Sequence, residues 1–194
     1  MAVALGGYGY VSDAHPALIA LYRAVAEGWD PPEDLSEAAW REAKSLPDSN
    51  PLKAFAGFGC SFGGKYFAGY ARGAGRNWAA EARRAVLRDV SWLKARACDL
   101  AHVDFLSIEP FATDMVLYLD PPYAGTTVYS LSFDPVAFQR RVRQWARYTD
   151  VFVSEYSFPF GECVLELSHG MSVALAGDRS GRTERLYWAG PGSL

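Results

Sequence analysis

The chain has 194 residues and a formal net charge of −3; half of its residues are hydrophobic and 14% are aromatic. These values allow one domain with a real core and exclude a disordered or fibrous chain. No apolar run reaches the roughly 18 residues of a membrane span, and no signal-peptide pattern precedes Arg23, the first basic residue. The 3 cysteines lack C-x-x-C spacing, so we expect no disulfide framework, no metal site and a reducing, cytoplasmic setting.

The first half of the chain predicts one strand, three helices and a glycine-rich loop. Apolar residues recur every three or four positions in the helical segments, and Ser36 is a suitable cap for the second helix. The stretch GFGCSFGGKYFAGY has neither helical nor strand periodicity and predicts an ordered loop. In chain order the predicted elements are a strand at 8–11, helices at 16–26 and 36–46, the loop at 55–70 and a long helix at 77–97.

The second half predicts a sheet. Continuous apolar runs are typical of strands buried in parallel sheets, and two short strands joined by a polar stretch predict a closing hairpin. The predicted strands are 100–105, 115–119, 151–154, 163–167 and 184–188, with a helix at 133–148. We therefore predict an α/β fold whose sheet is mostly parallel and ends in an antiparallel hairpin.

Charge is distributed unevenly along the sequence. Residues 53–96 contain nine basic side chains against two acidic ones, so the rest of the chain is strongly acidic. A basic segment on an acidic protein indicates a polyanion-binding patch, and the alternative is an ordinary solvated helix face.

The tetrapeptide Asp120-Pro121-Pro122-Tyr123 follows an apolar strand directly, where open α/β sheets bind ligands. A carboxylate and a backbone carbonyl held by two prolines can each accept a hydrogen from an exocyclic amine, which localises its lone pair for attack. The tyrosine ring offers a face to a flipped base. The alternative is a simple turn.

Together with other stretches, this motif resembles the D12-class (Dam-like) adenine-N6 DNA methyltransferases, especially a phage-type branch known from restriction-modification and phage systems. The similarity extends over nearly the whole chain. Among the matching stretches are SDAHPALIALY (12–22), GFGCSFGGKYFAGYARG (57–73), LYLDPPYAGTTVYS (117–130) and VFVSEYSFP (151–159). The resemblance implies a transferase with a Rossmann-like sheet, S-adenosylmethionine as cofactor, double-stranded DNA as partner, and no metal.

The resemblance also implies roles for particular residues. Asp120 and the Pro121 carbonyl would bind the target amine, and Tyr123 would stack on the adenine. Asp120 is also expected to be a polar anchor for the cofactor. Asp13 would accept from the cofactor ribose, or else serve the start of the following helix.

Two further residues are expected beside the cofactor adenine. Asp104 and Phe105 match the family there, although the pair could also be a strand end and a core phenylalanine. Glu155 and Tyr156 either line the base pocket or are strand-end polar residues, and His15, His102 and His169 are expected at the surface or at caps.

The segment 57–76 and the helix after it are the expected DNA-facing part, because cations there can meet phosphates and guanine edges. The alternative is a loop packed by its own aromatics. Residues 28–97 would form the recognition insert, and 1–27 with 98–194 the catalytic domain. The expected DNA-binding side chains are Lys65, Arg72, Arg76, Arg83, Arg84 and Arg88.

One departure concerns the start. The family opens with a W-x-G-G-K-type segment and a P-F-x-G-G loop around the cofactor, whereas this chain opens at the helix after that loop. We therefore expect weak cofactor binding by residues 1–194 alone, and either a separate N-terminal polypeptide or self-association to complete the sheet. Two alternative functions stay open: cytosine-N4 DNA methylation and a catalytically inactive DNA-binding remnant.

Overall fold

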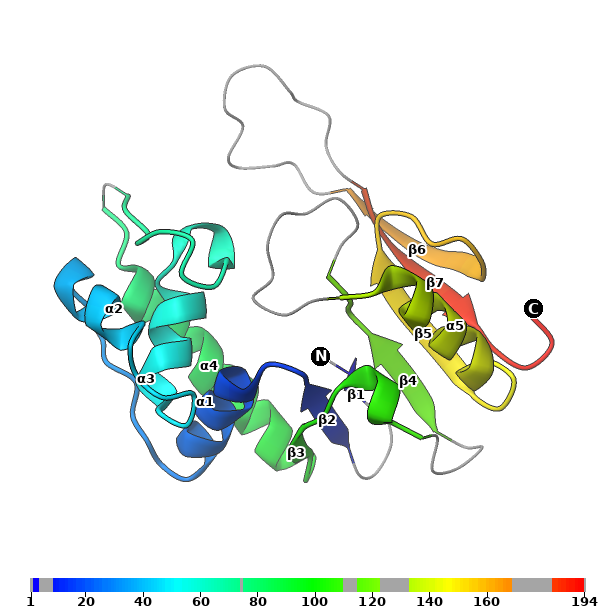
Figure 1. The fold of residues 1–194 in the computed structure, drawn as a ribbon, viewed down its shortest axis with the longest axis horizontal. Coiled ribbons are helices and arrows are strands. Elements are labelled where there is room, and N and C mark those ends of the chain that lie inside the picture. Colours follow the sequence, from blue (N-terminus) through cyan, green and yellow to red (C-terminus); the bar gives the residue numbers. More distant parts are fainter. Residues whose placement is uncertain are drawn as a thin grey trace, which may run out of the picture. The chain divides into compact units, whose positions relative to one another are not determined.

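The computed structural model describes residues 2–3, 9–73, 75–109, 115–122, 133–168 and 183–193 (Figure 1). The chain divides into two compact units. The first unit comprises residues 1–6, 105–127 and 133–194, and the second comprises 7–104 and 128–132. The predicted insert, 28–97, lies wholly within the second unit, which also includes residues on both sides of it. In the described ranges no helix is long and apolar enough to cross a membrane.

A mixed sheet and one helix make up the described part of the first unit. Neighbouring strands follow the order β1-β4-β5-β7-β6, in which β4 and β5 are parallel and every other pair is antiparallel. The strands are β1 (Ala2–Val3), β4 (Val116–Leu119), β5 (Asp150–Glu155), β6 (Glu162–Ser168) and β7 (Thr183–Ala189). The chain is thus an α/β fold that mixes parallel and antiparallel strands. The antiparallel pairing of β6 and β7 is confirmed, but the described strand pairs of this sheet are mostly antiparallel, not mostly parallel as we expected.

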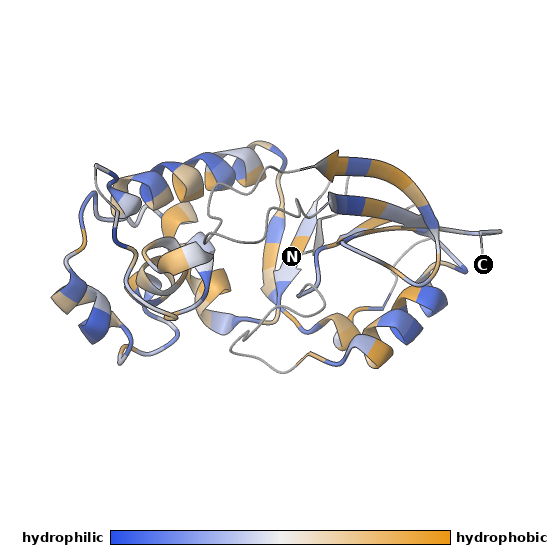
Figure 2. Cartoon of the chain, turned by 90° about the horizontal axis from the view of Figure 1, so that it is seen from above, coloured by the Kyte–Doolittle hydropathy of each residue, from blue (hydrophilic) through white to orange (hydrophobic). Residues whose placement is uncertain are grey.

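Helix α5 (Pro135–Trp145) connects β4 to β5. The Asp134 carboxylate accepts from the Val136 and Ala137 amides, so it satisfies two of the donors that a helix start leaves open. The helix buries Phe138, Val142 and Trp145 on one side and exposes polar residues on the other. Figure 2 shows this alternation of hydrophobic and hydrophilic residues.

The second unit combines a parallel strand pair with four helices. Strand β2 (Tyr10–Asp13) pairs with β3 (Asp99–His102). The helices are α1 (Pro16–Ala26), α2 (Glu37–Ala43), α3 (Pro51–Ala54) and α4 (Trp78–Ala95), with a π-helical turn at Phe55–Gly59 and a 3-10 turn at Phe62–Gly64.

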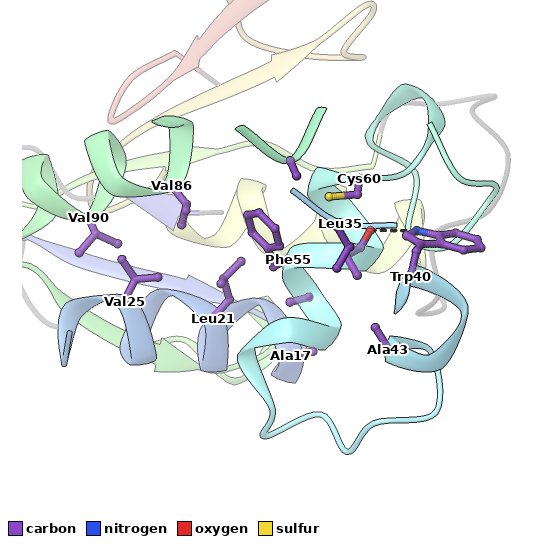
Figure 3. Packing of buried hydrophobic residues seen from close by; sticks show 13 residues of the cluster. Ala17, Leu21, Val25, Leu35, Trp40, Ala43, Phe55, Cys60, Val86 and Val90 are labelled. Atoms are coloured by element: carbon purple, nitrogen blue, oxygen red, sulfur yellow. Dashed lines mark hydrogen bonds between the residues drawn. The ribbon is translucent and has the colours of Figure 1, made fainter. Parts of the chain in front are cut away.

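Helices α1 and α4 face each other in the core of this unit. Leu21 and Val25 of α1 and Val86 and Val90 of α4 are buried in one cluster with Phe55 (Figure 3). Burying apolar side chains of this size stabilises a fold by about 1.5–3 kcal/mol each. This core anchors the glycine-rich segment, because Phe55 begins the π-helical turn.

Most predicted elements are confirmed, and three further expectations are wrong. Residues 2–3 form a strand on β4 where a helix was expected near the start, because β4 offers them backbone donors and acceptors. The segment 55–70 contains two helical turns and is not simply a loop. Strand β3 ends at His102, and Phe105–Ser107 form a 3-10 turn.

Candidate functional site

The Asp-Pro-Pro motif begins where β4 ends. Asp120 follows Leu119, the last residue of the strand, and is exposed, whereas Pro121 is buried and Pro122 half-buried. Because β4 and β5 are parallel, their carboxyl ends lie at the same edge of the sheet. Tyr123 lies outside the described residues.

Polar side chains gather on one face at this edge. Strand alternation and the pairing of Tyr118 with Phe152 place Tyr118, Asp120 and Ser154 on the same face. The Ser154 hydroxyl donates to Glu184 Oε1 on β7 at 2.8 Å. Burial raises the pKa of Tyr118, and its hydrogen bond with Ser154 opposes this shift, while the Asp120 and Glu184 carboxylates add to it. Our sequence reasoning missed Tyr118, Ser154 and Glu184, although the two-residue spacing of Tyr118 and Asp120 was a usable signal.

Glu155 is a buried carboxylate, 6% exposed, on the opposite face of β5 from Ser154. Its Oε1 accepts from the Tyr156 amide at 2.8 Å. On β7, Arg185 pairs with Glu155 in the sheet. Its guanidinium donates to the Tyr156 carbonyl oxygen at 2.7 Å and to Glu166 Oε1 at 2.7 Å. These contacts tie the chain after β5 to the sheet, next to the carboxyl edge where Asp120 lies.

Asp13 and Asp104 belong to the second unit. Asp13 ends β2 opposite His102 of β3, and its carbonyl accepts from the Val103 amide at 3.2 Å, so both carboxylates lie at the carboxyl edge of this strand pair. One carboxylate oxygen of Asp13 accepts from the His15 amide at 2.7 Å. His15 occupies the cap position of α1 without a side-chain bond, so Asp13 supports the turn into that helix as well.

His15 takes the cap position that was one of its two expected places, and its ring is part of an aromatic cluster. Its ring lies 5.0 Å from the Phe58 ring and 4.5 Å from the Tyr66 ring, centroid to centroid. Burial lowers the pKa of His15, and the Asp13 carboxylate opposes that shift. Within the described part of the chain, His15 Nδ1 and Tyr66 Oη are buried without a hydrogen-bond partner. Buried polar atoms usually have a hydrogen-bond partner. His15 Nδ1 and Tyr66 Oη are therefore available to bind a ligand atom.

Phe105 belongs to the first unit, unlike Asp104 before it. Its ring packs at 5.9 Å from the Phe133 ring and 5.4 Å from the Phe138 ring, so it contributes to the apolar contacts of α5. His102 is exposed, and its Nε2 lies 3.0 Å from the Ala14 carbonyl oxygen. His169 lies outside the described residues.

Most of the predicted DNA-binding cations are engaged in ion pairs. The hydrogen bond from Arg76 lowers the pKa of Glu81, and the exposed Arg84 lowers it further. Lys65 is exposed and makes no ion pair with another described residue. The ion pairs are Arg72–Glu37 (2.5 Å), Arg76–Glu81 (2.5 Å), Arg83–Asp30 (2.7 Å) and Arg88–Asp89 (3.1 Å).

The basic excess of this segment is balanced inside its own unit. Residues 7–104 carry 12 acidic and 12 basic side chains. Arg83 is held most tightly. Besides its ion pair with Asp30, it donates to the Pro31 carbonyl oxygen at 2.9 Å, and its side chain is only 24% exposed. The exposed pairs are weaker, since surface ion pairs contribute about 0–1 kcal/mol and can exchange partners.

Two of these arginines line a cavity of about 320 Å³ at the start of α4. The Arg76 guanidinium lies 3.9 Å from the centroid of the Trp78 ring, whose buried Nε1 has no partner among the described residues. Arg72, Tyr70 and Asp34 line the cavity too. Charges of both signs therefore surround this hollow, so it does not favour an anion. In the described ranges no group of His, Cys, Asp and Glu side chains could hold a metal ion.

Comparison with known proteins assigns no family to the chain. No protein-family model matches the sequence, and no curated protein matches it. The function therefore has to be argued from the residues and their geometry.

Proposed function

We propose that this protein is a DNA methyltransferase that modifies the N6 amino group of adenine, with a Rossmann-like methyltransferase sheet. The observation that carries the proposal is the Asp120-Pro121-Pro122-Tyr123 sequence directly after β4, at the carboxyl edge of a parallel strand pair. The polar face formed by Tyr118, Ser154 and Glu184 beside Asp120 supports it.

The residues suit the chemistry of an amine. Asp120 and the Pro121 carbonyl would each accept one hydrogen of the target amino group, which localises its lone pair and stabilises the positive charge that develops on attack. The two prolines restrict φ and so keep that carbonyl in place. The resemblance of the sequence gives Tyr123 the stacking role.

The second unit has residues that fit S-adenosylmethionine, which supplies an activated methyl group when it is bound. The ribose hydroxyls and the purine amine of this cofactor need hydrogen-bond acceptors, which ionised carboxylates are. Asp13 and Asp104 both lie at the carboxyl edge of the β2–β3 pair. The unpartnered His15 Nδ1 and Tyr66 Oη next to Asp13 offer additional hydrogen-bonding groups. Phe105, which the resemblance also assigns to the purine, belongs to the first unit and packs on Phe133 and Phe138, so we leave it out of this group.

We propose that the six cations expected from the sequence contact DNA. They are Lys65, Arg72, Arg76, Arg83, Arg84 and Arg88. Lys65 and Arg84 are exposed, and Arg72, Arg76 and Arg88 can exchange surface carboxylates for phosphates at little cost. Arg83 is the most strongly held of the six.

Replacement of Asp120 tests the proposal. In Asp120→Ala we expect methyl transfer to duplex DNA to fall at least about 100-fold, because an acceptor for developing charge is worth about 3 kcal/mol. DNA affinity should stay within a few-fold, since phosphate contacts supply most of it. Glu162→Gln, which neutralises an exposed carboxylate on β6, is the control and should keep the wild-type rate.

The outcomes separate the candidate functions. N6-methyladenine in the product supports the proposal, whereas N4-methylcytosine would assign the protein to the cytosine-specific alternative. A wild-type chain that binds DNA and transfers no methyl group would be the inactive remnant. An Asp120→Ala chain as active as the wild type would refute the role of Asp120.

A further inference from the structure

Helix α5 and the turn that closes it carry three exposed arginines, Arg140, Arg143 and Arg147. They follow one another by three and four residues, the spacing of one helical face. Phe138 and Val142 occupy the opposite, buried face. We call these three side chains the arginine ridge.

Charge in the ridge is not neutralised as it is in the second unit. Residues 135–147 contain no acidic side chain. Arg140 and Arg147 make no ion pair with any described residue, and the Arg143 guanidinium lies 4.1 Å from the centroid of the Phe160 ring. The fourth arginine of the helix, Arg141, turns inward and donates to the Ile108 carbonyl oxygen at 2.5 Å and to Glu109 at 2.6 Å.

A simpler role must be weighed against a binding role. Cations in the last turn of a helix interact favourably with its dipole, by about 0.3–1 kcal/mol each. That effect accounts for Arg143 and Arg147 near the end of α5, but Arg140 lies in the middle of the helix. The dipole also does not explain why three exposed guanidinium groups lie together without an ion pair to any other residue that the structure describes.

We infer that the arginine ridge binds the phosphate backbone of duplex DNA. Three guanidinium groups along seven residues spread over about 10 Å of helix axis. Duplex DNA presents one negative charge per about 1.7 Å of its own axis, so several phosphates fall within that reach. Guanidinium groups also bind phosphate in a bidentate manner. The inference rests on the proposed function, and it places phosphate contacts on the unit that carries Asp120.

The test is the salt dependence of duplex binding by the full chain. In Arg140→Gln/Arg143→Gln/Arg147→Gln, the slope of log K against log salt should fall by about three, because each phosphate contact contributes about 0.9. Each single variant should lower it by about one. The variant Arg140→Lys/Arg143→Lys/Arg147→Lys keeps the three positive charges, so it should keep the wild-type slope.

A matched control removes the same charge elsewhere. Arg41→Gln/Lys44→Gln/Arg96→Gln replaces three exposed cations outside the ridge and outside the six assigned residues, and it should change the slope by less than one. A ridge variant with the wild-type slope, or a control with an equal loss, would overturn the inference.

Methyl transfer, measured on the same proteins, separates this inference from the proposed function. A chain that methylates adenine while the ridge variant keeps its slope would refute only the ridge. A chain whose DNA binding depends on the ridge but which transfers no methyl group would refute only the proposed activity. A wild-type chain that does not bind duplex DNA would refute both.

Discussion

At the scale of single residues, Trp40 links two segments of the second unit. Its indole nitrogen donates to the Ala56 carbonyl oxygen at 3.1 Å and to Ser61 Oγ at 3.0 Å, and the side chain is only 8% exposed. We predict that Trp40→Phe lowers the free energy of unfolding by about 2 kcal/mol, because it leaves a gap and removes one of the donors to the Ala56 carbonyl and the donor to Ser61 Oγ.

The control for this prediction is Trp92→Phe. Trp92 is 39% exposed and its ring lies 4.0 Å from the Arg96 guanidinium, so its replacement should cost less than about 1 kcal/mol. Urea unfolding, monitored by circular dichroism, measures the free energy of unfolding of both variants. Equal losses in the two variants would show that the Trp40 hydrogen bonds contribute little.

At the scale of elements, local signals were enough for the helices. Asp134 and Pro135 predict the start of α5, and Ser36 predicts that of α2, because a cap and its first turn lie within four residues. The two-residue strand β1 could not be predicted in this way, since only its partner β4, more than a hundred residues later, makes it a strand.

The candidate site was predictable to a similar extent. The Asp-Pro-Pro motif and the strand before it are contiguous in sequence, so Asp120 could be placed at a strand end. The neutralisation of the basic segment could not be foreseen, because Glu37 and Asp30 reach Arg72 and Arg83 from 35 and 53 residues away. Packing and long-range ion pairing are set by the tertiary fold, which the local sequence pattern does not contain.

Gly59 is an element-scale test of how closely the π-helical turn approaches α4. A Cβ built on Gly59 would lie 2.6 Å from the Ala82 Cβ, so one of the two backbones would have to move. We predict that Gly59→Ala destabilises the protein by about 1–3 kcal/mol, the usual cost of overpacking. Gly73→Ala is the matched control, since its nearest neighbour would be the Trp78 indole at 3.6 Å, an ordinary contact. Thermal unfolding measures both, and an unchanged melting temperature in Gly59→Ala would contradict the close approach.

At the scale of the whole molecule, several buried acids of the second unit are held in their neutral form. Burial raises the pKa of the Cys60 thiol to about 12, and that of Tyr66 to about 12. The pKa of Tyr22 also rises to about 12, mainly through burial and further through the Asp89 carboxylate, to which its hydroxyl donates at 3.4 Å. These groups are neutral at pH 7 whether the chain is folded or unfolded, so they favour neither state there.

Alkaline solution should therefore destabilise the protein. In the unfolded chain a thiol ionises near pH 8.5 and a tyrosine near pH 10, whereas the folded groups hold their protons to about pH 12. Between these values the folded state binds more protons, so the free energy of unfolding falls as the pH rises from about 9 to 12. We predict that Tyr22→Phe makes this fall shallower by up to one proton, while Tyr148→Phe, which removes an exposed phenol, leaves it unchanged. Urea unfolding at several pH values from 8 to about 11 measures the slopes. If Tyr22→Phe loses stability with pH as steeply as the wild type, burial and the Asp89 carboxylate do not protect the Tyr22 hydroxyl from ionisation.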